Sequence, residues 1–319
     1  MKFRLTLCGL ALGLLIAGAA SVPATLEAQG SDGRWFLQPR TGVERVVAPF
    51  LEGWYENEDG TYSFSFGYLN LNDEVIEIPV GEGNNITPAQ FDGMQPTTFQ
   101  PGKHRGVFAV TVPASMRDQD VWWTITNPNG KVTKVPGRTL WNAYQLDWNP
   151  RPHGTVPPAM SFDDGSDDVG RGPPGVTSQR TVSARVGSRV ELSVDAEDIS
   201  VRDPADPRFR EPTSVRVLWS QYQGPAGGEV EFARHESTPE PEPREGRGGG
   251  GGDGGFGGGA AGPESIMLTG GGTARVYATF SVPGEYVLRA QADNWRSPDS
   301  SSGDQCCWTN AYVRVNVTQ

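Results

Sequence analysis

Alternation of apolar and polar residues is the feature that most limits what this 319-residue chain can fold into. In the segment TYSFSFGYLN an aromatic residue occupies every second position: Tyr62, Phe64, Phe66 and Tyr68. Successive side chains of a β-strand point to opposite faces, so these four residues share one face. The pattern predicts a strand with one buried aromatic face. It follows NEDG, residues 57–60, whose Asp-Gly pair indicates a tight hairpin turn.

Similar segments recur between residues 35 and 148 and predict an N-terminal β-sandwich. We expect its strands at 50–56, 62–68, 75–80, 106–112, 121–127 and 131–135. The turn-forming residues of NPNG, 127–130, connect the last two strands. Trp122 and Trp123 are neighbours in one strand, so they point to opposite faces and at most one belongs to the core.

A second block of alternating segments covers residues 177–319. VGSRVELSVDAED, VRVLWSQYQGP, ATFSVPGEYVLRAQADN and YVRVNV each place apolar residues at every second position. In the second of these segments Trp219 shares the inward face with Val215 and Val217. Gly (42) and Pro (26) exceed a fifth of the chain, which is typical of short strands joined by turns. The predicted fold class is therefore all-β, with two tandem β-sandwich domains.

These four segments resemble, in order, successive strands of a PKD-like domain, a member of the immunoglobulin-like sandwiches. The resemblance covers about residues 180–318 and is carried by Trp-Ser followed by Gly-Pro, and by Phe-x-x-Pro-Gly-x-Tyr. It implies an extracellular module for spacing and binding, and no particular chemistry. The whole chain is also similar to secreted bacterial proteins that pair such a domain with an N-terminal sandwich.

Two segments without periodicity interrupt the strands. Residues 149–176 are rich in Pro, Gly and Asp and are predicted to form an interdomain linker. Residues from about 236 to 272 include a long Gly-rich run, which departs from the PKD-like pattern. Because this composition buries little apolar surface, we expect a disordered insertion within the second domain.

The first 28 residues have the pattern of an export signal, with Lys2 and Arg4 before an apolar run and small residues after it. The run is too short to span a bilayer comfortably, and Cys8 lies inside it rather than after it, which argues against a lipoprotein. We expect a secreted, periplasmic or cell-surface protein without a membrane span. The net charge of −11 argues against nucleic acid as a partner.

Cys306 and Cys307 are adjacent, and thiols in an oxidising compartment tend to be oxidised. Neighbouring Cα atoms lie about 3.8 Å apart, below the usual disulfide range, so a bond between them needs a distorted turn. We favour a strained vicinal disulfide, with buried free thiols or intermolecular pairing as alternatives. A metal site is disfavoured because two thiolates are an incomplete ligand set.

Exposed aromatic rings in the first block are the candidate ligand site, because such rings stack on sugars. The candidate glycan-binding residues are Trp54, Tyr55, Trp122, Trp141 and Tyr144. The alternative is that most of them belong to the core. A weaker candidate is a calcium site formed by the acidic loop FDDGSDD, whose carboxylates are Asp163, Asp164, Asp167 and Asp168. A solvated acidic segment is the preferred interpretation of that loop.

A catalytic site is not indicated. The three histidines, His104, His153 and His235, share no recognisable motif with a nucleophile, and the Gly run lacks the ending of a phosphate-binding loop. We therefore predict a monomeric, non-enzymatic recognition or surface-architecture protein without a cofactor, binding a glycan or an extracellular protein. The alternative is a polysaccharide-active enzyme or accessory subunit that acts through the N-terminal domain.

Overall fold

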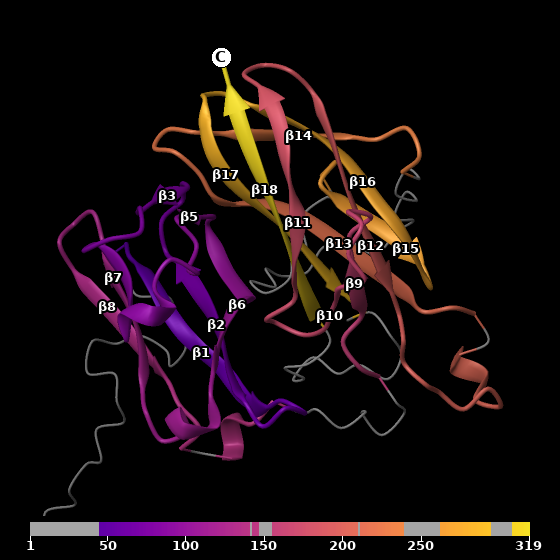
Figure 1. Ribbon diagram of the computed structural model, residues 1–319, viewed down its shortest axis with the longest axis horizontal. Coiled ribbons are helices and arrows are strands. Elements are labelled where there is room, and N and C mark those ends of the chain that lie inside the picture. The colour runs from indigo at the N-terminus through magenta and orange to yellow at the C-terminus, as the bar shows by residue number, and fades with distance from the viewer. Residues whose placement is uncertain (1–44, 141, 147–154, 210, 239–261, 295–307) are drawn as a thin grey trace, which may run out of the picture. The chain divides into compact units, whose positions relative to one another are not determined.

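The computed structural model describes residues 45–140, 142–146, 155–209, 211–238, 262–294 and 308–319 (Figure 1). Residues 44–319 belong to one compact unit. The secondary structure of the described residues is almost entirely β, with four short 3₁₀ turns, η1 to η4. The turns are η1 Ala89–Phe91, η2 Ala114–Met116, η3 Asn142–Tyr144 and η4 Pro207–Phe209. None of the helices described is long and apolar enough to cross a membrane.

The described residues of the first block form eight strands in three small antiparallel sheets (Figure 1). The strands are β1 Val47–Glu56, β2 Tyr62–Asn70, β3 Ile76–Glu77, β4 Asn84–Thr87, β5 Thr98–Phe99, β6 Gly102–Val112, β7 Val121–Thr126 and β8 Val132–Gly137. Their orders within the sheets are β1-β2-β6, β4-β7-β8 and β3-β5. The predicted strand at 75–80 is reduced to the two residues of β3.

The hairpin β1-β2 confirms the turn predicted at 57–60, where the amide of Gly60 donates to the carbonyl of Asn57. The aromatic face of β2 is buried, as expected. The opposite face is buried too, because Ser63 and Ser65 are inaccessible to solvent. Alternation in β2 therefore separates an aromatic side from a polar side, and both sides are covered.

Buried amide side chains connect the loops and sheets of the first block. Asn84 is fully buried; its Nδ2 donates to the carbonyls of Ile78 and Pro96, and its Oδ1 accepts from Trp123 Nε1 at 2.9 Å. Asn127 bridges β1 and β7 in the same way, because its Oδ1 accepts from the amide of Val47. These bonds satisfy backbone groups that the short strands leave unpaired.

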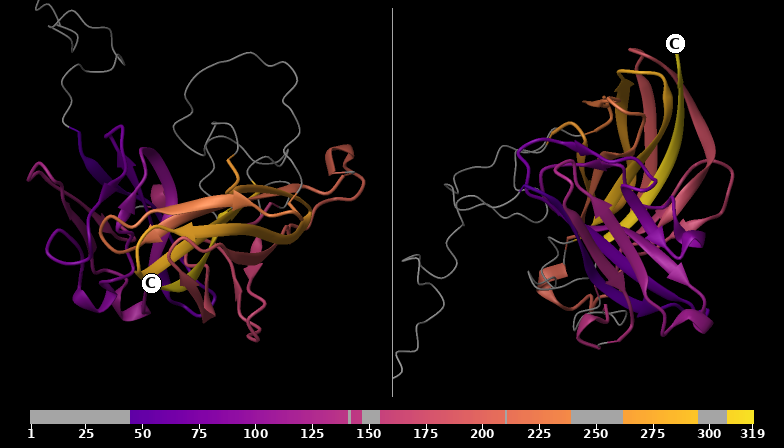
Figure 2. Two further views of the ribbon diagram at one scale, coloured as in Figure 1. Left: turned by 90° about the horizontal axis from the view of Figure 1, so that it is seen from above. Right: turned by 90° about the vertical axis from the view of Figure 1, so that its left-hand side faces the viewer.

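The second block is a sandwich of two five-stranded sheets, which Figure 2 shows as packed layers. One sheet has the order β10-β9-β12-β16-β14 and the other β11-β18-β17-β13-β15. The strands are β9 Ala159–Ser161, β10 Val169–Gly170, β11 Val176–Arg185, β12 Val190–Glu197, β13 Ser214–Gln223, β14 Val230–Arg234, β15 Ser265–Thr269, β16 Gly271–Phe280, β17 Gly284–Asp293 and β18 Trp308–Thr318. All pairs are antiparallel except β11 with β18, which are parallel.

The core between these two sheets follows the predicted alternation. Trp219 is 1% exposed and packs in one cluster with Val215 and Val217, as expected. In the segment Phe-x-x-Pro-Gly-x-Tyr, the hydroxyl of Tyr286 donates to the carbonyl of Val282 at 2.9 Å. This bond is the tyrosine corner of immunoglobulin-like sandwiches, where a tyrosine at the start of a strand fixes the preceding turn. The second block is an immunoglobulin-like sandwich.

Two predicted boundaries differ from the structure. Within the predicted linker, 159–161 form β9, which pairs with β12, and 169–170 form β10, which pairs with β9. Within the predicted insertion, 265–272 form β15 and the start of β16. Both stretches are rich in Gly, Pro or polar residues, yet they form strands because neighbouring strands complete their hydrogen bonds.

The first block is joined to the sandwich by side chains that hydrogen-bond to consecutive backbone carbonyls of β6. Arg289 Nη1 donates to the carbonyl of Val107 at 2.9 Å, and the hydroxyl of Tyr312 reaches the same oxygen at 3.1 Å. Asn310 Nδ2 donates to the carbonyl of Gly106 at 2.9 Å. We call this set of bonds the β6 joint. Tyr222 of β13 also packs in the hydrophobic core of the first block.

Several predictions fall outside the described residues. They concern the export signal at 1–28, the disorder of the Gly-rich insertion over 239–261, the pair Cys306 and Cys307, Trp141, and His153 with the first part of the linker. These stay predictions from the sequence.

Candidate functional site

The sheet β4-β7-β8 exposes one face, and the strict alternation of β7 determines which side chains lie on it. Val121, Trp123 and Ile125 point into the core and are fully buried. Trp122, Thr124 and Thr126 point outward and are half-buried. The register of the sheet adds neighbours from the flanking strands: Thr87 and Asn85 from β4, and Pro136, Lys134 and Val132 from β8. We call this surface the Trp122 face.

Two cations lie over the ring of Trp122. Lys134 Nζ is 4.9 Å from the ring centroid, and Arg138 Cζ is 5.9 Å from it. Arg138 also forms an ion pair with Asp120. Cations at such distances are attracted to the electron-rich face of an indole. They limit the motion of the ring and leave a half-buried aromatic surface among hydroxyl, amide and ammonium groups.

The described candidates among the five aromatic residues differ in exposure. Trp122 is half-buried on this face, and Tyr144 is 44% exposed in η3. Trp54 and Tyr55 are 4% and 1% exposed, so the prediction that they present open rings is wrong. The remaining candidate, Trp141, is outside the described part of the chain.

The burial of Trp54 and Tyr55 has a physical cause. They are consecutive in β1, so they point to opposite faces of the sheet β1-β2-β6, and both faces of this sheet are covered. Trp54 packs against Tyr62 with ring centroids 6.2 Å apart. Burial raises the pKa of the Tyr55 hydroxyl well above its ordinary value. Spacing alone does not tell whether the second face of a strand meets water or protein.

The acidic loop 163–168 is organised by one carboxylate. Asp164 accepts hydrogen bonds from the amides of Gln179 and Ser166 and from the hydroxyl of Ser178. These donors, led by the Gln179 amide, lower the pKa of Asp164 to about 2. Among the residues described, His, Cys, Asp and Glu side chains form no group of three or more that could hold a metal ion. Asp164 thus connects the loop to β11.

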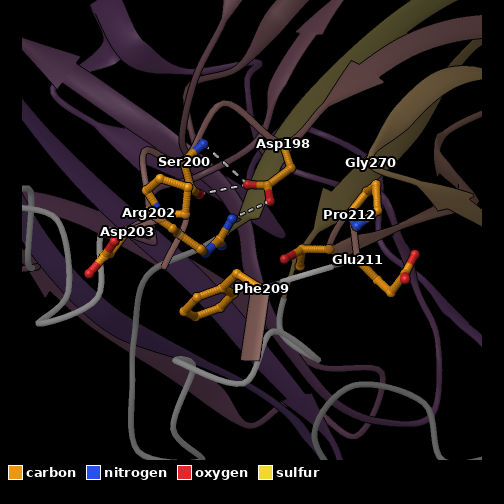
Figure 3. A pocket seen from close by; sticks show the side chains of 10 residues that line it. Asp198, Ser200, Arg202, Asp203, Phe209, Glu211, Pro212 and Gly270 are labelled. Carbon is orange, nitrogen blue, oxygen red and sulfur yellow. Dashed lines mark hydrogen bonds and ion pairs between the residues drawn. The ribbon is translucent and has the colours of Figure 1, made fainter. Parts of the chain in front are cut away.

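Figure 3 shows a pocket of about 290 Å³ beside the loop between β12 and β13. At its back Asp198 Oδ2 accepts from Arg202 Nη1 at 2.6 Å, and both side chains are more than nine-tenths buried. Asp198 Oδ1 accepts from the hydroxyl of Ser200, and the Arg202 guanidinium lies over the ring of Phe209. Arg202 neutralises Asp198, so this buried ion pair stabilises the loop.

The two described histidines lie apart. His104 stacks on Tyr68 with centroids 4.8 Å apart, and its Nε2 is 3.0 Å from the carbonyl of Pro101. Burial lowers the pKa of His104. His235 Nδ1 is 2.8 Å from the hydroxyl of Ser237, and its Nε2 is 3.6 Å from a carboxylate oxygen of Glu191. Ser237 also donates its backbone amide to Nδ1, which makes this a local turn at the end of β14.

Comparison with known proteins gives no family model that matches the chain and no match among curated proteins. Solved structures give weak likenesses. The ASH/PapD-like domain 7 of human CEP192 matches at 12% identity and a TM-score of 0.24, covering 52% of this chain and 87% of that one. The D0-D1 domain of intimin matches at 10% identity and 0.23, covering 85% and 98%. The Yersinia pseudotuberculosis adhesin InvE matches at 12% and 0.23, covering 87% and 62%. These scores are too low to carry an argument about function.

Proposed function

We propose that this chain is an exported, non-enzymatic recognition protein whose Trp122 face binds carbohydrate. The observation that supports the proposal is the half-buried Trp122 ring, held by Lys134 and Arg138 on a strand face of alternating polar residues. The two cations limit the motion of the ring, and its accessible part offers an apolar surface to the C–H groups of a sugar. Thr124 and Lys134, which are paired across β7 and β8, supply hydrogen-bonding groups beside it.

In this proposal the second sandwich is a PKD-like support. The resemblance of its sequence segments to that family and its tyrosine corner favour this assignment. The β6 joint fixes the first block to the sandwich, so the Trp122 face is presented on a preorganised surface. Preorganisation lowers the entropy that binding must offset. Export is inferred from the basic and apolar start of the sequence.

The test is a binding assay of the full chain on a panel of soluble polysaccharides, followed by isothermal titration with each one that binds. We expect saturable binding without release of reducing sugar. Trp122→Ala should weaken binding by about tenfold or more, as expected for a central aromatic anchor. Leu71→Ala is the control, since Leu71 is an exposed apolar residue that follows β2 and lies outside the strands of this face.

Three outcomes would contradict the proposal. Equal losses in both variants would show that Trp122 is not a specific anchor. Release of reducing sugar would favour a polysaccharide-active enzyme. Absence of binding across the panel would reject carbohydrate as the ligand and direct the search to extracellular protein partners.

A further inference from the structure

A second pocket, of about 280 Å³, lies at one end of the second sandwich. It is formed where β11 ends, the chain turns into β12, and β18 ends beside β11 (Figure 1). Six polar side chains contribute to its lining: Ser183, Arg185, Ser188, Arg189, Asn316 and Thr318. The other lining residues are apolar, so the lining contains two cations and no carboxylate. This composition is notable in a chain of net charge −11.

Within the described parts of the chain, neither arginine forms an ion pair with a carboxylate at salt-bridge distance. Arg185 is exposed and lies opposite Thr318 in the parallel register of β11 and β18. Arg189 is held by stacking, because its Cζ is 4.2 Å from the centroid of the Tyr277 ring. The Tyr277 hydroxyl donates to a carboxylate oxygen of Glu236 at 2.7 Å, so this hydrogen bond holds the Glu236 carboxylate beside the tyrosine. The hydrogen bond from Tyr277 and, to a smaller extent, the charges of His235 and Arg189 lower the pKa of Glu236. Both guanidinium groups therefore keep hydrogen-bonding capacity for a ligand.

The backbone around the pocket is already fixed. The amide of Ser188 donates to the carbonyl of Arg185, and the amide of Val186 donates to the carbonyl of Thr318. The hydroxyl of Thr318 donates to the carbonyl of Ala184 at 3.4 Å. These bonds hold the ends of β11 and β18 together, so the two arginines approach the pocket from a rigid frame. Little order is lost when a ligand binds to such a frame.

We propose that this pocket binds an oxyanion group, such as a carboxylate, a sulfate or a phosphate. Guanidinium groups match the paired oxygens of these ions and form charge-assisted hydrogen bonds with them. The hydroxyl of Ser188 and the amide of Asn316 add neutral donors at the same pocket. The proposal is independent of the Trp122 face, which lies in the first block.

The experiment uses the full chain and inorganic sulfate, inorganic phosphate and acetate as probes. Isothermal titration is performed at constant ionic strength against sodium chloride, so that general screening is the same in every run. We expect saturable binding of at least one of the three anions. Arg185→Gln and Arg189→Gln should each weaken it by about tenfold, because each removes a charge-assisted hydrogen bond. Circular dichroism confirms that the variants fold.

The control is Arg180→Gln, which removes one positive charge from the same strand, β11, outside the pocket lining. It should leave the affinity unchanged within about twofold, since exposed charges farther away are screened. A second variant tests whether removing a negative charge near the pocket raises the affinity for the anion. Glu285 is the register partner of Asn316, so Glu285→Gln removes a neighbouring negative charge and should strengthen binding.

The source of the oxyanion is decided by comparing these free anions with a sulfated and a carboxylated polysaccharide at equal concentrations of acid groups. Tighter binding of a polymer that is lost in Arg189→Gln assigns the pocket to acidic polysaccharides. Equal binding of free anion and polymer assigns it to the small ion. No saturable binding of any probe, or equal losses in Arg180→Gln and Arg189→Gln, would overturn the proposal.

Discussion

The two blocks of this chain are held in their folds by different interactions. The second sandwich has two five-stranded sheets, and its core is built from alternating Val, Ala and aromatic residues on long strands. The first block has sheets of two or three strands, so fewer of its backbone groups find partners in a ladder. Buried amide side chains such as Asn84, Gln95 and Asn127 supply the missing hydrogen bonds. The long ladders of the second sandwich pair its backbone groups along each strand, whereas the short ladders of the first block rely more on buried amide side chains.

The largest effect expected from this difference is at Asn84. Asn84→Ala leaves the carbonyls of Ile78 and Pro96 and the Nε1 of Trp123 without their partner. Each unsatisfied buried group costs about 1–3 kcal/mol, so the loss of unfolding free energy should be on the order of 5 kcal/mol. Urea unfolding followed by fluorescence measures it. Asn85→Ala is the control, because Asn85 lies on the outer face of the same strand and should change stability little.

A smaller effect is expected at the β6 joint. Gly106 has φ +53°, and a Cβ at this position would overlap the indole of Trp308. Gly106→Ala should therefore lower the unfolding free energy by roughly 3 kcal/mol, the sum of left-handed strain and displacement of the indole. Gly102→Ala in the same strand has φ +92° and open space around its Cβ, and should cost only about 1 kcal/mol. Equal costs would show that Trp308 does not pack on β6.

A matched pair of tryptophans compares the two blocks directly. Trp123 and Trp219 are both almost fully buried, but Trp123 Nε1 donates to Asn84, whereas Trp219 Nε1 is buried without a hydrogen-bond partner in the described structure. Replacement by Phe removes similar volume at both sites. Trp123→Phe should cost about 1–2 kcal/mol more than Trp219→Phe, because it also orphans Asn84 Oδ1. If urea unfolding gave equal costs, the polar contribution to the first block would be negligible.

The smallest effect is a difference in pH dependence. The pKa of His104 is lowered by burial, so the unfolded chain binds its proton more readily. Neutral His104 makes its full contribution to the unfolding free energy above a pH of about 6.5. This contribution is lost as the pH falls through the pKa of the folded state. In the second sandwich the pKa of Asp164 is about 2, so its contribution is lost only as the pH falls from about 4 through 2.

Stability measured against pH separates the two groups. His104→Gln should remove the loss of stability that begins as the pH falls below about 6.5, and should leave the loss of stability at lower pH in place. Asp164→Asn should do the reverse. A profile that either variant left unaltered would show that the corresponding side chain has the same pKa in the folded and unfolded chain.

The second sandwich was largely predictable from the sequence. The inward positions of Trp219 and Tyr286 follow from period two alone, since a sandwich buries one face of each strand. The strands β9 and β15 were missed because short polar or Gly-flanked segments have no periodicity of their own. Pairing with β12 and β13, far away in the sequence, determines them.

The candidate site was predicted only in part, for the same reason. Alternation predicted that Trp122 and Trp123 point to opposite faces and that at most one belongs to the core, and in the structure Trp123 is buried and Trp122 half-buried. It gave no indication that both faces at Trp54 and Tyr55 are covered, nor that Arg185 and Arg189 meet Asn316 at one pocket. Those facts depend on contacts between segments far apart in the sequence, which local patterns do not encode.

The central claim is that two differently stabilised blocks form one unit through the β6 joint. Hydrogen exchange of the full chain in increasing urea, read by mass spectrometry, follows peptides from β7 and β17 separately. The account predicts that both peptides lose protection at the same urea concentration, and that Gly106→Ala moves the β7 transition to lower urea than that of β17. Separate transitions in the unsubstituted chain would contradict it.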